Sequence, residues 1–181
     1  MRRVAWGITG SGDRLRQTVN VMKEVKKLYP NVEVSVYLSK AGEKVVKIYG
    51  LMEELKKEFK NIRVEIDSNT PFLAGQLQVG RFEFLLIAPA TSNTVAKISL
   101  GIADTLLTNS AIMALKAFVP VYIMPSDYAE GITETELPDG RKIKIRIRKE
   151  DVENVNRIKA MGIFVLEKPE DIFGVFKKHF G

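Results

Sequence analysis

The segment Leu85–Leu107, "LLIAPATSNTVAKISLGIADTLL", decides the fold, because it passes from a strand through a polar turn into a helix. Its first four residues are apolar, and a proline at position 89 interrupts the apolar run. The turn "ATSNT" then places three hydroxyls and an asparagine before a stretch whose apolar residues have helical spacing. A buried strand that ends in polar, uncharged side chains is typical of a ligand site in an α/β protein.

Strand-like and helix-like segments alternate along the rest of the chain. Short apolar runs bounded by turn residues predict strands, and apolar residues three or four positions apart predict helices. The predicted strands are residues 3–8, 32–38, 62–66, 82–88, 120–124 and 163–166. The predicted helices are residues 13–28, 42–59, 93–100, 109–118 and 151–161, with a last helix opened by "KPEDI". This alternation predicts an α/β fold: a doubly wound, Rossmann-like parallel sheet with helices on both faces.

Length and composition narrow the class of protein. The 181 residues are interpreted as one domain, residues 1–181. The chain has no cysteine, which excludes disulfides, thiolate metal sites and cysteine catalysis, and its one histidine, His179, is assigned to a solvated helix end. No apolar run reaches the roughly 18 residues of a membrane span. The N-terminus enters a strand directly rather than a signal peptide. We therefore expect a cytoplasmic protein that binds no membrane.

Right-handed crossovers would bring the loops after four of the strands to one edge of the sheet. These loops are "TGSGD" (9–13), "SKAGE" (39–43), "APATSNT" (88–94) and "MPSDY" (124–128). The first loop opens a helix, so its amides and the hydroxyls of Thr9 and Ser11 can hold a phosphate, although many such loops are simple turns. Ser39, Thr91 and Ser92 have helix capping as the alternative role. Four polar, uncharged loops favour a neutral heterocycle with a phosphate over a metal.

Residues 87–108, followed by the strand "PVYIMP", resemble the signature of the homo-oligomeric flavin-containing decarboxylase superfamily. The resemblance implies a single FMN-binding flavoprotein domain, with the phosphate near the first loop and Ser39, and the ring and ribityl chain near residues 91–94. It also implies a homo-oligomer, a trimer or a multiple of trimers, with flavin between subunits. The cofactor-binding residues that it implies are Thr9, Gly10, Ser11, Gly12, Ser39, Ala90, Thr91, Ser92, Asn93, Thr94, Ser126 and Tyr128.

The sequence departs from the decarboxylases at their catalytic positions. Gly75 stands where that family has its histidine, Pro125–Tyr128 replaces the family's "PAMN", and the flap cysteine is missing. The chain is therefore more similar to the archaeoflavoproteins and the dihydromethanopterin reductases, and its composition suits an archaeal source. That resemblance implies an FMN-dependent oxidoreductase with a ferredoxin-like donor and an acceptor such as dihydromethanopterin. The alternatives are a decarboxylase or flavin prenyltransferase-like enzyme with altered catalytic residues, and a non-catalytic flavin carrier. No catalytic residue is assigned.

Residues 131–149 interrupt the alternation and predict a β-hairpin. "LPDGR" fits a three-residue loop with Gly140 in the left-handed conformation, which pairs Glu136 with Lys142 and Glu134 with Lys144. Arg141–Lys149 holds six basic residues and no acid, so the net charge of +6 is local. One interpretation is a solvated hairpin whose charges prevent edge aggregation. The other is a docking patch for an acidic ferredoxin-like donor or a polyglutamyl pterin; nucleic acid is disfavoured because no aromatic platform accompanies the charges. The docking residues would be Lys142, Lys144, Arg146 and Arg148.

Overall fold

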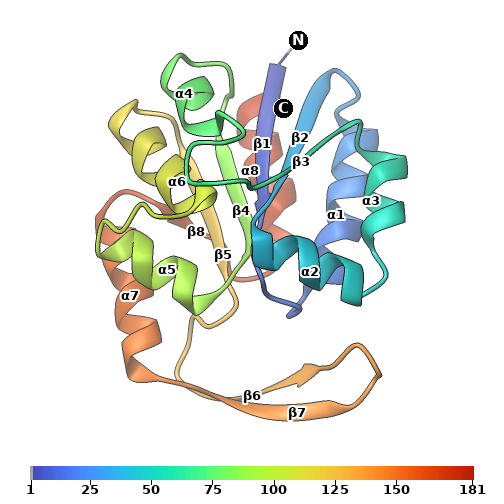
Figure 1. Cartoon of the computed structure of the whole chain (residues 1–181), viewed down its shortest axis with the longest axis vertical. Helices are drawn as coiled ribbons and strands as arrows, with labels where there is room; N and C mark the ends of the chain where they lie inside the picture. Colours follow the sequence, from blue (N-terminus) through green and yellow to red (C-terminus); the bar gives the residue numbers. More distant parts are fainter. Residues whose placement is uncertain (1) are drawn as a thin grey trace.

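The computed structural model describes residues 2–181. A six-stranded sheet with the order β3-β2-β1-β4-β5-β8 forms its centre, and every neighbouring pair of strands is parallel (Figure 1). The order confirms the predicted doubly wound sheet, with the switch point between β1 and β4. The strands of this sheet are β1 (Arg2–Ile8), β2 (Val32–Leu38), β3 (Asn61–Val64), β4 (Leu85–Ala90), β5 (Val121–Pro125) and β8 (Phe164–Val165).

Helices cover both faces of the sheet, and each face has its own apolar core. Along β1, Trp6 joins one core and Ala5 the other, as alternation along a strand covered on both sides requires. Trp6 is fully buried, as predicted, and its Nε1 donates to the Ala88 carbonyl at 2.8 Å. The first core receives α1 (Leu15–Leu28), α2 (Lys40–Ile48), α3 (Met52–Glu58) and α8 (Asp171–Phe180). The second receives α4 (Leu73–Gln78), α5 (Ser92–Ser99), α6 (Leu106–Lys116) and α7 (Lys149–Ala160).

The structure corrects several predicted helix boundaries. The single helix predicted for residues 42–59 is two helices, because Gly50 adopts φ 70° and ends α2 before fully buried Leu51 enters the core. Helix α6 begins earlier than predicted, since Thr105 and Thr108 form a capping box. Helix α4 was not predicted, because six residues are too few to display a helical period.

Two further expectations are wrong in detail. The strand predicted from residue 82 begins at Leu85. Phe82 and Phe84 lie just before the strand, and both side chains are buried in the core. His179 lies in the last turn of α8, as predicted, but it is half-buried rather than solvated: its Nε2 lies 2.9 Å from the Tyr122 hydroxyl, and its ring packs on Phe84 with centroids 4.7 Å apart. No helix within residues 2–181 is long and apolar enough to cross a bilayer.

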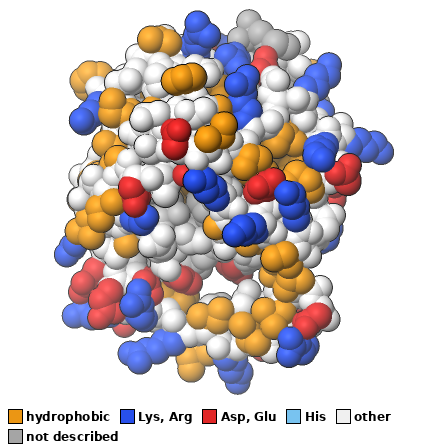
Figure 2. All heavy atoms as spheres, viewed as in Figure 1, with side chains coloured by type: hydrophobic (Ala, Val, Ile, Leu, Met, Phe, Trp, Pro, Cys, Tyr) orange, Lys and Arg blue, Asp and Glu red, His pale blue; other side chains and the backbone are white. Residues whose placement is uncertain are grey.

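The β-hairpin follows β5, as predicted, and consists of β6 (Gly131–Glu136) and β7 (Lys142–Ile147). Its antiparallel register pairs Glu136 with Lys142 and Glu134 with Lys144, and Gly140 has φ 84°, so the predicted bulged turn is confirmed. The hairpin lies across the carboxyl ends of the parallel strands, and an opening separates it from the body of the molecule (Figure 1 and Figure 2).

Candidate functional site

Thr9 joins the ends of the two central strands at the switch point. Its buried hydroxyl donates to the Pro89 carbonyl at 2.9 Å and accepts from the Thr91 amide at 2.9 Å. The sequence predicted Thr9 as a direct ligand donor, but the hydroxyl proton is already used inside the protein. Thr9 therefore acts by holding the first loop and the "ATSNT" turn in register.

Ser11 and Ser126 connect the first loop to the loop after β5. Their hydroxyl oxygens lie 2.5 Å apart, although 115 residues separate them in the chain. The amide of Ser126 also donates to the carbonyl of buried Ala90 at 2.9 Å. Three of the four predicted loops are thus joined by direct hydrogen bonds between residues that the sequence had assigned to the cofactor.

The amides of the first loop can bind an anion. The backbone N–H groups of Gly10, Ser11 and Gly12 find no acceptor within residues 2–181, and they precede the first turn of α1. Unused amides at a helix start attract a negatively charged group, because the helix dipole adds to their own donors. A Cβ on Gly10 would lie 2.7 Å from the Ala41 Cβ, so only glycine lets the first two loops approach this closely.

Arg14 is a functional candidate that the sequence prediction missed. It occupies the N-cap position of α1 with φ 53°, and its Nε donates to Asp13 at 2.9 Å. Its guanidinium also donates to the carbonyls of Pro125 at 2.8 Å and Glu167 at 2.5 Å. One side chain thus ties the first loop to the β5 loop and to the segment before α8. A basic residue at a helix start, where acids are favoured, is the signal that was overlooked.

Ser39 and Thr91 both act as helix caps, which was the alternative open for each. Ser39 accepts from the Gly42 amide at 2.9 Å, and Thr91 accepts from the Thr94 amide at 3.1 Å. Capping leaves one lone pair of the Ser39 hydroxyl available, whereas the Thr91 hydroxyl also bonds to the Thr94 hydroxyl at 3.0 Å. Asn93 is exposed on the first turn of α5, in agreement with a position open to a ligand.

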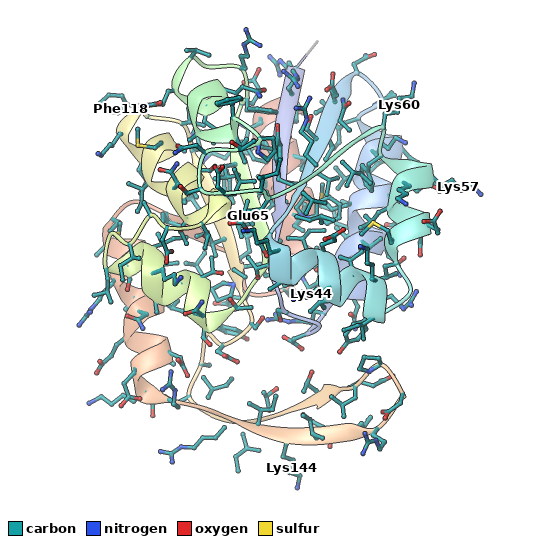
Figure 3. The ribbon with its side chains drawn as sticks, in the orientation of Figure 1. Lys44, Lys57, Lys60, Glu65, Phe118 and Lys144 are labelled. Atoms are coloured by element: carbon teal, nitrogen blue, oxygen red, sulfur yellow. The ribbon has the colours of Figure 1, made fainter. Side chains whose placement is uncertain are left out.

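Glu65 is a second residue that the prediction missed. It is buried after β3 and accepts from the Lys40 amide and from the Leu106 amide, both at 3.0 Å. Figure 3 places it between α2 and α6, and its carboxylate caps both helices. A carboxylate between two helix N-termini is stabilised by both dipoles. Glu65 therefore fixes the position of α2, whose cap is Ser39.

A cavity of about 920 Å³ lies between the hairpin and the first loop. Its volume falls in the usual range for cofactor and substrate sites. Among the predicted cofactor residues it is lined by Gly12, Ser126 and Tyr128, whereas Ser39 and residues 91–94 lie outside it. The Tyr49 hydroxyl donates to the Glu136 carbonyl at 3.0 Å and so anchors the hairpin tip over the cavity.

The remaining predicted residues occupy different places. Lys144 points away from the body of the molecule (Figure 3), whereas Arg148 is held by Asp151 at 2.6 Å. Hydrogen bonds from Arg148 lower the pKa of the Asp151 carboxyl. Gly75 lies on α4, at the end of the sheet opposite the four loops (Figure 1). Within one chain, the position of the decarboxylase histidine is therefore remote from this edge.

Burial raises the pKa of the Asp127 carboxyl, and the Asp151 and Asp13 carboxylates add to the effect, while Ser92 and Arg14 oppose it. Burial also raises the pKa of the Tyr49 hydroxyl, with smaller contributions from Asp13 and Glu136. Both groups are therefore shifted toward the neutral form. Hydroxyls and free amides give this edge the chemistry to bind an anion beside an uncharged polar ring.

Residues 1–176 of the chain match the protein family described as "Flavoprotein". An uncharacterized protein of Methanocaldococcus jannaschii is 53% identical over 180 residues, covering 99% of this chain and 96% of its own length. A dihydromethanopterin reductase (acceptor) of the same organism is 36% identical over 155 residues, covering 81% of this chain. The match spans only 63% of the reductase, so this chain corresponds to part of that protein.

Solved structures agree with this family. The DmrB protein of Burkholderia xenovorans, described in complex with FMN as a cubic protein cage for redox transfer, has a TM-score of 0.82 and 29% identity. The alignment covers 98% of this chain and 94% of that one. A dodecameric FMN-dependent decarboxylase from Escherichia coli O157:H7 has a TM-score of 0.69 at 18% identity, covering 91% of this chain and 79% of its own, which shows the shared fold alone.

Proposed function

The chain belongs to the flavoprotein family, and we propose that it is an FMN-dependent oxidoreductase that passes electrons from a ferredoxin-like donor to an acceptor, with dihydromethanopterin as the first candidate. The observation that carries the proposal is the meeting of polar, hydroxyl-bearing loops at the switch point, where three amides of the first loop remain unused. Flavin supplies hydride and single-electron transfer when it is bound.

The residues at this edge fit FMN. The amides of Gly10, Ser11 and Gly12 suit a phosphate, and the Ser11–Ser126 hydroxyl pair lies beside them. Ser92, Asn93 and Thr94 offer hydrogen bonds to a ribityl chain and a ring edge, and Tyr128, 38% exposed, offers an aromatic surface. Ser39 and Thr91 hold two of the loops in place as helix caps, and Ser39 retains a free lone pair.

An oxidoreductase is favoured over a decarboxylase by the residues that are missing. Gly75 has no side chain to act as an acid or base. A Cβ at this position would meet nothing within 4 Å, so no close contact requires a glycine there. Two relatives that match 81% and 76% of this chain are named as dihydromethanopterin reductases, and the match to DmrB covers nearly the whole chain. A decarboxylase with rearranged catalytic groups stays the alternative, because such enzymes share the fold.

We also propose that the chain functions in the cytoplasm as a homo-oligomer, a trimer or a multiple of trimers. Several large apolar side chains are exposed on one chain, which is typical of surfaces that subunits cover. Phe118, at 95% exposure, projects from the end of α6 (Figure 3), and others are spread over the face seen in Figure 2. Five more exposed apolar side chains belong to the segments that flank α4 and α5: Ile66, Phe72, Val79, Leu100 and Ile102.

The proposal is tested by stopped-flow absorbance of the FMN-loaded protein. Reduced ferredoxin, NADH and NADPH are offered separately, and dihydropterin is added after reduction. We expect ferredoxin to bleach the flavin band fastest and the pterin to restore it. A protein that binds no FMN, or one that no donor reduces, would contradict the proposal. Turnover of a cysteine-derived acid or a prenyl phosphate would favour the decarboxylase or transferase alternative instead.

A further inference from the structure

Asp127 is a carboxyl group in the loop after β5, with Ser126 and Tyr128 on either side. It is partly buried, and hydrogen bonds of the neighbouring Ser126 fix its loop against the other loops of this edge: the Ser126 amide donates to the Ala90 carbonyl at 2.9 Å, and the Ser126 and Ser11 hydroxyl oxygens lie 2.5 Å apart. The loop therefore places a titratable group beside the proposed flavin-binding residues. None of the roles described above uses this carboxyl.

Four charged groups surround Asp127, and they form two closed ion pairs. On the first loop, Arg14 pairs with Asp13 at 2.9 Å. At the start of α7, Arg148 pairs with Asp151 at 2.6 Å, and a second hydrogen bond of 3.0 Å joins the same two side chains. The remaining donors of Arg14 are directed at backbone carbonyls.

Asp127 consequently has no counter-ion of its own. Within residues 2–181 no Lys, Arg or His nitrogen approaches its carboxylate closely enough for a salt bridge. The two arginines act on it only at longer range, and the carboxylates of Asp13 and Asp151 oppose its ionisation. Burial acts in the same direction and is the largest cause of the raised pKa of Asp127.

We propose that the Asp127 carboxyl binds a proton from water when electrons enter the flavin site and releases it when they leave. The proposal rests on the proposed function, because it needs a redox group at this edge. Electrons added to that group bring negative charge close to a carboxylate that has no counter-ion, which favours the protonated acid. The electrons come from the external donor, the proton comes from water, and the only bond formed is an O–H bond on Asp127.

A purely structural role for Asp127 would have a different signature. If the carboxyl only caps α5 or orders the β5 loop, its protonation state is the same in the oxidised and reduced protein. A substitution would then change stability or FMN affinity, but not the number of protons taken up with the electrons. The test must therefore count protons rather than turnover.

The first measurement is the midpoint potential of the bound FMN as a function of pH. The wild-type protein should show a pH interval in which the potential falls more steeply, because one additional proton accompanies the electrons. Asp127→Asn should lack this interval, and Asp127→Glu should retain it at a shifted pH. Asp139→Asn is the matched control, since Asp139 is an exposed aspartate on the hairpin tip that pairs with Arg141 at 2.8 Å.

The second measurement is redox difference infrared spectroscopy of the same proteins. Reduction of the wild type should produce a band of a protonated carboxyl that shifts in D₂O and that moves in Asp127→Glu. This comparison keeps the test valid even if Asp127→Asn binds FMN poorly. An unchanged steep interval in Asp127→Asn, or an infrared band unaffected by both substitutions, would overturn the inference.

The two proposals fail in different ways. If the wild-type protein binds no FMN, the proposed function fails before Asp127 is tested. If FMN binds and is reduced but no carboxyl band appears, the oxidoreductase proposal stands and the role of Asp127 is refuted.

Discussion

At the scale of single residues, Arg14 shows how a side chain can organise a site without entering it. A left-handed backbone costs about 1 to 2 kcal/mol for a residue other than glycine. Arg14 adopts one nonetheless, and this turns its guanidinium toward Asp13, Pro125 and Glu167. These hydrogen bonds offset the backbone strain, since bonds to charged groups are each worth about 1.5 to 3 kcal/mol.

Replacing Arg14 should weaken FMN binding. In Arg14→Gln the carbonyls of Pro125 and Glu167 lose their donor, so the β5 loop is no longer held against the first loop. A loss of about 1 to 3 kcal/mol corresponds to roughly 5- to 150-fold in dissociation constant. Quenching of FMN fluorescence measures it, and Arg157→Gln, which removes an exposed charge on α7, is the control.

Arg14→Lys separates charge from geometry. Lysine keeps the positive charge but lacks the planar fork that reaches several acceptors at once. We expect it to recover little of the lost affinity. Recovery of wild-type affinity would show that Arg14 acts through its charge alone.

At the scale of secondary-structure elements, α7 depends on a single buried carboxylate. Asp151 caps the helix by accepting from the backbone amide of Arg148 at 3.1 Å, and it binds the guanidinium of the same residue. The side chain of Asp151 is only 6% exposed, so these bonds are largely protected from water. These bonds close the first turn of the helix that follows the hairpin.

Asp151→Asn should lower stability in a pH-dependent manner. The Arg148 hydrogen bonds lower the pKa of Asp151 in the folded state, so its stabilisation is present above its unfolded pKa and is lost as the pH falls through the folded pKa. We expect a loss of about 1 kcal/mol at pH 7, since Arg148 is mostly exposed to solvent.

Urea unfolding of both proteins at neutral and strongly acidic pH measures this effect. The difference between wild type and Asp151→Asn should shrink toward acidic pH, because the wild-type carboxyl then also becomes neutral. Glu153→Gln, on the exposed side of α7, is the control. A difference that stays constant with pH would contradict the assigned cause.

At the scale of the whole molecule, the hairpin concentrates positive charge beside the proposed redox site. Its basic side chains share one face by register, and Lys144 projects away from the body (Figure 3). Lys142 is paired with Glu134 at 3.1 Å and Arg148 with Asp151, so Lys144 and Arg146 are the better candidates for contact with a donor. A surface of this kind raises the association rate of an acidic partner.

Reversing two of these charges should slow electron entry. Lys144→Glu combined with Arg146→Glu is expected to lower the second-order rate of reduction by an acidic ferredoxin by at least tenfold at low salt, with a smaller effect at high salt. Reduction by dithionite should be unchanged. The matched control is Lys57→Glu combined with Lys60→Glu, on the far side of the molecule (Figure 3). Equal slowing in both pairs would refute docking at the hairpin.

Much of the fold follows from local patterns in the sequence. Apolar runs and turn residues located all six strands of the parallel sheet, and their alternation with helices predicted its doubly wound form. The hairpin register followed from the single position of Gly140, because a left-handed residue there fixes which residues face each other. These predictions succeed because strand period, turn conformation and crossover hand depend on residues close together in the chain.

The sequence by itself therefore determined the flavin-type α/β sheet, the loops at its carboxyl edge and the basic hairpin. Only the tertiary structure decided how those loops are held: Arg14 reaches Pro125, Glu65 caps two helices, and Ser126 meets Ser11. Such contacts join side chains dozens of residues apart, and no local period records them. Which polar groups are already satisfied, and which remain free for a ligand or a proton, is decided when the strands bring them together.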